Sequence, residues 1–338
     1  MEERKSYIDV LRILAIFSVI LLHCNTNFFP IASLYPQREW LLANCINAIS
    51  RFGVPIFFMI SGYLLLSANS SDNIGKFYKK RLLRILPPFL IWNVVYYIIL
   101  CMKGQASPFP YNFFLRMIHQ SISYHFWFVY MIMNFYIFTP FFRKIILNCT
   151  QKQLWLLFFI ILLPTTIFPL LNKIIGVWFF TFSPIIEGYF GYFLLGYLLG
   201  HFDLPKKYQY ILYILALICI PIVISGTYYG STTEKIDTFF NGGYQFNSYF
   251  IASAIFLFVK YNMPKIKCKR TVKFLTLLGN LSFGLYLCHV LIIEKLHTIL
   301  TGLQANVEIF SYTFITFFGG YFLLILLYQI KPLRRLLF

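Results

Sequence analysis

Acidic residues are scarce in this sequence, and charged residues of either sign make up only 12% of its 338 positions. Soluble domains carry about 25% charged and about 45–50% apolar residues, whereas 59% of this chain is apolar. So little charge cannot cover a water-facing surface of this size. The composition therefore excludes a disordered chain, a collagen, a coiled coil and an ordinary soluble enzyme, and indicates an integral membrane protein.

The sequence also lacks the cysteine patterns of metal sites and disulfide frameworks. Its seven cysteines form no C-x-x-C pair, and no histidine is separated from them by a metal-ligand spacing. We therefore expect neither kind of site. Polar segments are short as well, and the longest connection between apolar runs, near 103–123, cannot fold by itself. One membrane domain over 1–338, with no appended soluble domain, is expected.

Continuous apolar runs dominate what is present. A membrane-crossing helix needs about 20 apolar residues, and these runs lack the alternation of a β-barrel. In the sixth run, the spacing of Gly191, Gly196 and Gly200 predicts close contact between helices. Ten spans are predicted, at 8–29, 44–67, 83–102, 124–142, 154–172, 185–201, 208–228, 244–261, 272–298 and 309–330.

Basic residues are unevenly distributed among the connections. Most of the 29 Lys and Arg residues lie at the two ends and in the even-numbered connections. The positive-inside rule then places both termini in the cytoplasm, which requires an even number of spans. The expected fold class is all-α, a single bundle of about ten transmembrane helices. The net charge of +18 serves topology and contact with anionic lipids, not nucleic-acid binding.

Three ionisable residues lie within the first predicted span: Asp9, Arg12 and His23. Arg12 and His23 are eleven residues apart, which places them on one helix face and about 16 Å apart along its axis. Arg12 then lies in the inner quarter and His23 in the outer half. Two simpler interpretations stay open: Arg12 could be a snorkelling residue paired with Asp9, and His23 a hydrogen-bonded packing histidine.

A second basic feature, KFYKKRLLR, places Arg81 and Arg84 at i, i+3 as the third span begins. Two guanidiniums on one helix face can bind phosphates through bidentate hydrogen bonds. The alternative is a simple topology anchor. The remaining intramembrane polar residues fall mainly in the outer half, and Ser282, Tyr286 and His289 share one helical face. The others are Arg51, His125, Glu187, Glu294 and His297.

Several segments at these residues resemble a known family. They are YIDVLRILAIFSVILLHCN with Arg12 and His23, VPIFFMISGYLL (54–65), KKRLLRILPPF (79–89), HFWFVYMIMNFYIFTPFFRK (125–144) and LSFGLYLCHVLII (281–293). They are similar to motifs of the acyltransferase 3 family, bacterial membrane acyltransferases that acylate cell-surface glycans. The resemblance covers essentially the whole chain, and the first span is its most specific part. Some members add an extracytoplasmic esterase-like domain, which we do not expect here.

The resemblance implies an O-acetyltransferase in the bacterial inner membrane. Its donor would be cytoplasmic acetyl-CoA, and its acceptor a hydroxyl of an envelope polysaccharide or a lipid-linked glycan precursor. Arg81, Arg84 and Arg12 would hold the CoA phosphates, and His23 would act as general base. No metal is implied, and a homo-oligomer remains open. The alternative is a non-enzymatic polysaccharide exporter or transporter.

A general base needs an orienting group, and Glu187, Glu294 or Tyr286 could provide it, whereas Asp9 lies about 21 Å away along the helix. Arg12, Glu187 and Tyr286 are thus catalytic candidates beside His23. The oxyanion would need donors such as Tyr286, His289 or Ser61. Candidate acceptor-binding residues are Arg51, Ser61, His125, Trp127 and His289.

Overall fold

The computed structural model describes residues 6–67, 73–119, 121–176, 188–243, 245–263, 266 and 268–337. Every regular element in these ranges is a helix, so the expected all-α class is confirmed there. The α-helices are α1 Ser6–Cys24, α2 Arg38–Ser50, α3 Gly53–Leu66, α4 Ile74–Met102, α5 Pro110–His119, α6 Trp127–Leu147, α7 Gln151–Leu162, α8 Phe168–Ile175, α9 Tyr189–His201, α10 Lys206–Gly230, α11 Phe246–Asn262, α12 Lys269–Ile299, α13 Ala305–Phe314, α14 Gly320–Gln329 and α15 Lys331–Leu337.

Short helical turns and bulges join several of these helices. The 3₁₀ turns are Asn25–Asn27, Ala32–Leu34, Tyr124–Phe126 and Phe239–Asn241. The π-helical segments Leu163–Ile167 and Ile315–Gly319 connect α7 to α8 and α13 to α14. Such bulges interrupt a helix without ending it, so each pair crosses the molecule as one bent rod.

Within the ranges given above, seven helical segments are long and apolar enough to cross a membrane, and each coincides with one predicted span. They are Ser6–Asn27, Arg38–Leu66, Ile74–Met102, Gln151–Ile175, Lys206–Gly230, Lys269–Ile299 and Ala305–Gln329. The predicted spans 124–142, 185–201 and 244–261 overlap α6, α9 and α11, which are not among these seven. Ten crossings therefore stay a prediction, as do the cytoplasmic termini.

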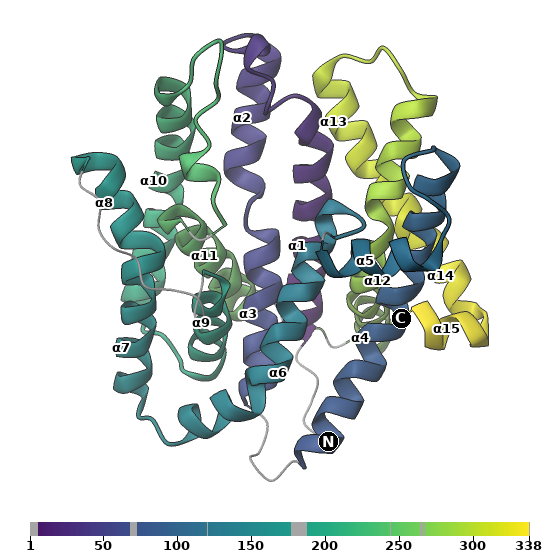
Figure 1. The fold of residues 1–338 in the computed structure, drawn as a ribbon. Coiled ribbons are helices and arrows are strands. Elements are labelled where there is room, and N and C mark those ends of the chain that lie inside the picture. The colour runs from purple at the N-terminus through teal and green to yellow at the C-terminus, as the bar shows by residue number, and fades with distance from the viewer. Residues whose placement is uncertain are drawn as a thin grey trace.

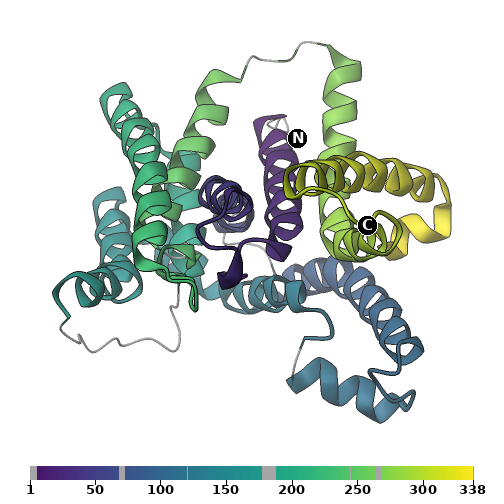
Figure 2. The same cartoon turned by 90° about the horizontal axis from the view of Figure 1, so that it is seen from above.

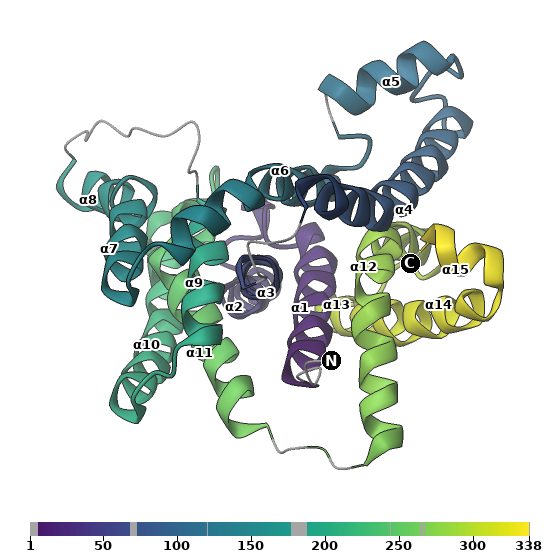
Figure 3. The ribbon, with the colours of Figure 1, turned by 90° about the horizontal axis from the view of Figure 1, so that it is seen from below.

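The long helices lie side by side, and α1 runs through the middle of the bundle (Figure 1). Seen from above and from below, α1 lies between α3 on one side and α12 on the other (Figures 2 and 3), and it packs directly on both. Its side chains Leu11, Ala15, Ile16 and Ile20 are fully buried. A helix that is apolar around most of its circumference occupies the interior of a large bundle.

The peripheral helices have the opposite character. On α7 and α10, large apolar side chains such as Leu156, Phe159, Ile214 and Leu217 are exposed. Exposed apolar surface on this scale is not stable in water. These helices therefore present the lipid-facing surface of a multi-pass membrane protein, as the composition predicted.

Close contact between α3 and α9 depends on two glycines. A Cβ atom on Gly62 would lie 1.7 Å from the carbonyl oxygen of Phe193, and one on Gly196 would lie 1.9 Å from that of Met59. At Gly191 and Gly200 the obstacles would be tyrosine rings. The close helix contact predicted from this glycine spacing is confirmed.

One predicted span differs from the structure in a way that matters for the site. Residues 44–67 were expected to form one continuous helix, but α2 ends at Ser50 and α3 begins at Gly53. Pro55 explains the break, because it has no N–H to bond the carbonyl of Arg51, four residues earlier. The turn at Arg51 and Phe52 directs the Arg51 side chain into a cavity described below.

Candidate active site

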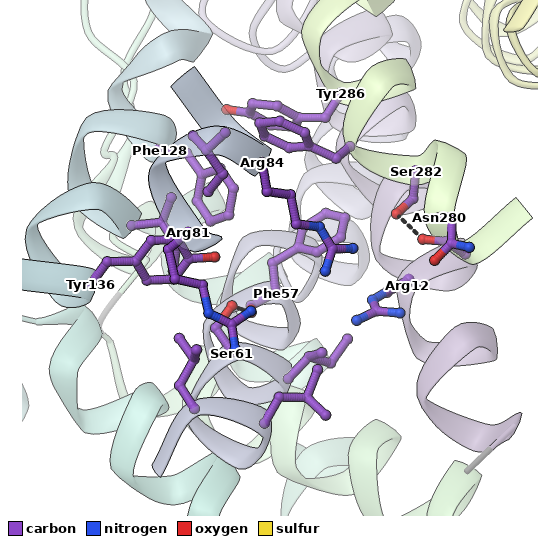
Figure 4. A pocket seen from close by; sticks show the side chains of 17 residues that line it. Arg12, Phe57, Ser61, Arg81, Arg84, Phe128, Tyr136, Asn280, Ser282 and Tyr286 are labelled. Atoms are coloured by element: carbon purple, nitrogen blue, oxygen red, sulfur yellow. Dashed lines mark hydrogen bonds between the residues drawn. The ribbon is translucent and has the colours of Figure 1, made fainter. Parts of the chain in front are cut away.

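Arg12 is held in place by a carboxylate. Its Nη1 lies 2.9 Å from Oδ1 of Asp9, one turn earlier on α1. Asp9 is fully buried, and its Oδ2 also accepts a hydrogen bond of 3.2 Å from the Thr276 hydroxyl on α12. The expected Asp9–Arg12 pair is therefore present. It orients Arg12 toward a cavity and does not direct it to the membrane surface (Figure 4).

This inner cavity has a volume of about 130 Å³ and brings together Arg12 from α1 with Arg81 and Arg84 from α4. Figure 4 shows the three guanidiniums converging on it. Arg81 lies 5.6 Å from the centre of the Phe77 ring, and the buried Arg143 of α6 lies 4.7 Å from the same ring. With three guanidiniums and one paired carboxylate, the cavity attracts anions.

Tyr286 lines the inner cavity together with two other aromatic side chains. Its ring lies 5.1 Å from Phe128 and 6.4 Å from Phe57, and all three residues line the cavity. The Tyr286 hydroxyl donates a hydrogen bond to the backbone carbonyl of His125. Ser61 also lines this cavity, with its hydroxyl bonded to the Phe57 carbonyl at 2.8 Å. Ser61 thus lies with the arginines, apart from His23.

Three histidines from different helices meet beyond Tyr286. The His289 ring centre is 5.1 Å from that of His23, 5.0 Å from that of His125 and 5.6 Å from that of Tyr286. His125 and His289 are fully buried. Nδ1 of His289 lies 2.6 Å from the Tyr286 carbonyl oxygen, so this nitrogen carries the proton.

His23 has a partner that sequence reasoning missed. Its Nδ1 lies 3.1 Å from the hydroxyl oxygen of Tyr124. If Nδ1 carries the proton and donates to that oxygen, Nε2 keeps a free lone pair and can accept a proton. Tyr124 directly precedes His125, but no spacing rule links it to a helix about a hundred residues earlier.

A second, outer cavity of about 470 Å³ lies at the other end of α1. His23 and Arg51 both line it. Nε and Nη2 of Arg51 donate to Oδ1 of Asn47 at 3.1 and 2.8 Å, and Nη1 donates to the Asn241 carbonyl. The structure therefore brings His23 and Arg51 to one cavity and places the inner arginines on another.

Other predicted site residues lie elsewhere. Glu294 forms an ion pair of 2.9 Å with Lys103, and His297 lies 3.2 Å from Glu308, so the structure gives neither as a partner of His23. Trp127 packs on Tyr189, with ring centres 5.2 Å apart, and lines neither cavity. Glu187 lies outside the described residues. Tyr286 bonds the His125 backbone and is likewise not the group that contacts His23.

Sequence comparisons agree with this arrangement. The family model described as an acyltransferase domain, acyltransferase 3, matches residues 5–328. The succinoglycan biosynthesis protein ExoH of Rhizobium meliloti (strain 1021) is 31% identical over 108 residues, 31% of this chain and 29% of that protein. An amino-acid racemase of Enterococcus faecalis is 31% identical over 134 residues, 38% of this chain and 18% of that protein.

The chain therefore matches less than a third of the length of either relative. No solved structure matches it. The family match, in contrast, extends from the start of α1 to the end of α14 and includes both cavities. This chain belongs to the acyltransferase 3 family.

Proposed function

We propose that this protein is a membrane O-acetyltransferase that transfers an acetyl group from cytoplasmic acetyl-CoA to a hydroxyl of an envelope glycan or a lipid-linked glycan precursor. One observation carries the proposal. The inner cavity, with Arg12, Arg81 and Arg84, ends at Tyr286, and the ring of Tyr286 adjoins a histidine cluster that reaches the outer cavity.

The inner cavity would bind the donor. CoA carries several phosphate charges, and guanidiniums bind phosphate oxygens in a bidentate manner. Its pantetheine arm is about as long as the roughly 16 Å along α1 between Arg12 and His23. With the phosphates at the arginines, the thioester would pass Tyr286 and reach the histidine cluster.

His23 would then act as general base. Its Nε2 takes the proton of the acceptor hydroxyl, the hydroxyl oxygen attacks the thioester carbonyl carbon, and the carbon–sulfur bond breaks. The imidazolium then gives this proton to the departing CoA thiolate, so His23 ends the reaction in its starting neutral form. Nδ1 would keep its proton throughout and donate it in a hydrogen bond to the Tyr124 hydroxyl oxygen, which lies 3.1 Å away.

The charge distribution supports ten crossings with both termini in the cytoplasm of a bacterial inner membrane. In that orientation Arg81 and Arg84 face the compartment that holds acetyl-CoA, and the basic ends contact anionic lipids. A relative named for succinoglycan biosynthesis fits a glycan acceptor. The racemase activity named for the other relative is not carried over, because the match covers 18% of that protein.

The proposal is tested with purified protein in lipid vesicles, by measuring release of free CoA thiol from acetyl-CoA in the presence of envelope glycan acceptors. His23→Ala should lower turnover by about 10²–10⁴-fold, the usual result of losing a general base. The exposed His119 on α5 provides the matched control, His119→Ala, with unchanged turnover.

Retention of more than a tenth of wild-type turnover by a folded His23→Ala variant would contradict the assignment of His23. Acceptor transport without any CoA release would favour the exporter alternative.

A further inference from the structure

The outer cavity has an unusual charge balance. Arg51 and His23 line it, together with the amides of Asn25, Asn47 and Asn241, and none of its described lining residues is Asp or Glu. A neutral ligand would leave the Arg51 charge uncompensated in a partly buried position, which is unfavourable. This cavity is the acceptor side of the proposed function, and the following inference rests on that function.

The Arg51 guanidinium is held in one orientation by hydrogen bonds, but not all of its N–H donors are used. A guanidinium has five N–H donors. Three are used, two toward Oδ1 of Asn47 and one toward the Asn241 carbonyl. Among the described residues no carboxylate pairs with Arg51, so one N–H on each terminal nitrogen remains. Two adjacent N–H groups on a fixed guanidinium match the two oxygens of a carboxylate or a phosphate.

The hydrogen bonds of Asn47 and Asn241 fix the orientation of the amide groups beside Arg51. Oδ1 of Asn47 must accept from Arg51, so its Nδ2 is the donor to Oδ1 of Asn241, at 2.6 Å. Nδ2 of Asn241 is then buried without a partner. The side-chain hydrogen bonds therefore run from Arg51 to Asn47 and from Asn47 to Asn241, and they end in an unused donor on Asn241, a residue that lines the cavity.

Asn25 offers the complementary group on the same cavity. Its Nδ2 donates to the Ala43 carbonyl at 2.8 Å, which leaves its Oδ1 buried and without a partner. Asn25 is 1% exposed and Asn241 is 8% exposed. Buried polar atoms are nearly always paired, so an unpaired donor and an unpaired acceptor on two residues that line one cavity favour a polar ligand, toward which each amide would turn on binding.

We propose that the acceptor glycan is acidic, and that Arg51 binds its carboxylate or phosphate while Asn25 and Asn241 bind neighbouring hydroxyls. The bound anion fixes the position of the sugar, so that another hydroxyl faces His23. The anion could belong to the sugar, as in a uronic acid, or to the diphosphate of a lipid carrier. Both sources present the same paired oxygens to Arg51.

Binding to the purified full-length protein, without acetyl-CoA, separates these sources. One probe pair is a galacturonate oligosaccharide and its methyl ester, in which each carboxylate is replaced by a neutral ester of nearly the same size. The second pair is an isoprenyl-diphosphate-linked sugar and the same isoprenyl sugar without phosphates. We expect wild-type protein to bind one acidic probe at least tenfold more tightly than its neutral counterpart. The pair that shows the preference identifies the source.

Arg51→Gln should remove this preference by lowering the affinity for the acidic probe at least tenfold. Arg38→Gln, at the exposed start of the same α2 helix, is the matched control and should keep the preference. Equal binding of both members of both pairs by the wild-type protein would overturn the proposal without any variant. A preference that persists in folded Arg51→Gln would overturn it as well.

Failure of the proposed acyltransferase function can be distinguished from failure of the proposed anion site. Binding of an acidic probe that depends on Arg51, without CoA release for any acceptor, would contradict the acyltransferase proposal and still support the anion site.

Discussion

We expect Tyr124 to decide which nitrogen of His23 carries the proton. Tyr124 is 55% exposed, so its hydroxyl is free to donate its own proton elsewhere and to accept from Nδ1 of His23. This leaves Nε2 unprotonated, the state that a general base needs. No carboxylate contacts His23 in the part of the chain that the structure describes, which leaves out Glu187. We therefore propose the Tyr124 phenol, and not Glu294 or Tyr286, as the group that orients His23.

Tyr124→Phe should therefore lower kcat by about tenfold, which is about 1.4 kcal/mol in activation free energy. KM for acetyl-CoA should stay the same, because the inner cavity is untouched. The exposed Tyr111 on α5 gives the control Tyr111→Phe, with unchanged kinetics. Steady-state CoA release measures both constants. A wild-type kcat in Tyr124→Phe would contradict a role for the Tyr124 hydroxyl in the reaction.

The two α4 arginines make a different prediction, because lysine preserves their charge but not their geometry. In Arg81→Lys or Arg84→Lys, a single ammonium replaces the planar donor pair. We expect the affinity for acetyl-CoA to fall by about tenfold in each variant. Arg116→Lys on α5, which lines neither cavity, should bind like wild type. Titration calorimetry gives the dissociation constants, and unchanged affinity in both variants would reduce the pair to a topology anchor.

At the scale of the helices, the contact between α3 and α9 makes the sharpest prediction. Gly196→Ala would place a methyl group 1.9 Å from a backbone oxygen that cannot rotate away. We expect the free energy of unfolding to fall by at least about 3 kcal/mol, at or above the upper end for overpacked sites. Gly319→Ala is the matched control, because no atom lies within 4 Å of its added Cβ. Thermal unfolding in detergent compares the two, and equal midpoints would contradict this packing.

Much of the candidate site was predictable where it depends on one helix. The spacing of Arg12 and His23, and of Arg81 and Arg84, follows helical periodicity, which is local. The α2–α3 break and the contact of Arg51 with Asn241 were not predicted. That contact joins residues 190 positions apart, so only the tertiary packing brings them together.

The side chains around His289 show the same limit of prediction from sequence. Ser282, Tyr286 and His289 were correctly placed on one face of α12, and Ser282 and Tyr286 line the inner cavity. Their relation to His125 could not be predicted, because it depends on how α6 approaches α12. The contact between Arg143 and the Phe77 ring was not predictable either, because Arg143 reaches that ring from a different helix.

For the whole molecule, the two cavities predict sidedness. Arg12 lines the inner one and His23 the outer one, at opposite ends of α1. In vesicles with uniformly oriented protein, acetyl-CoA on the cytoplasmic face and acceptor on the other face should support transfer. The reverse arrangement should not. Mass spectrometry of the recovered acceptor measures the product. Transfer only when both substrates share the cytoplasmic face would contradict passage of the acetyl group across the bilayer.

The aromatic closure formed by Tyr286, Phe57 and Phe128 has a consequence for the cell as well as for the reaction. A cell that stores energy as an ion gradient cannot tolerate a continuous water path through its membrane. A thin, uncharged acyl chain can slip between rings, but a hydrated proton or sodium ion would lose its water shell there at high cost. In the proposed reaction, these three rings would let the pantetheine arm pass with its acetyl group and would exclude hydrated ions.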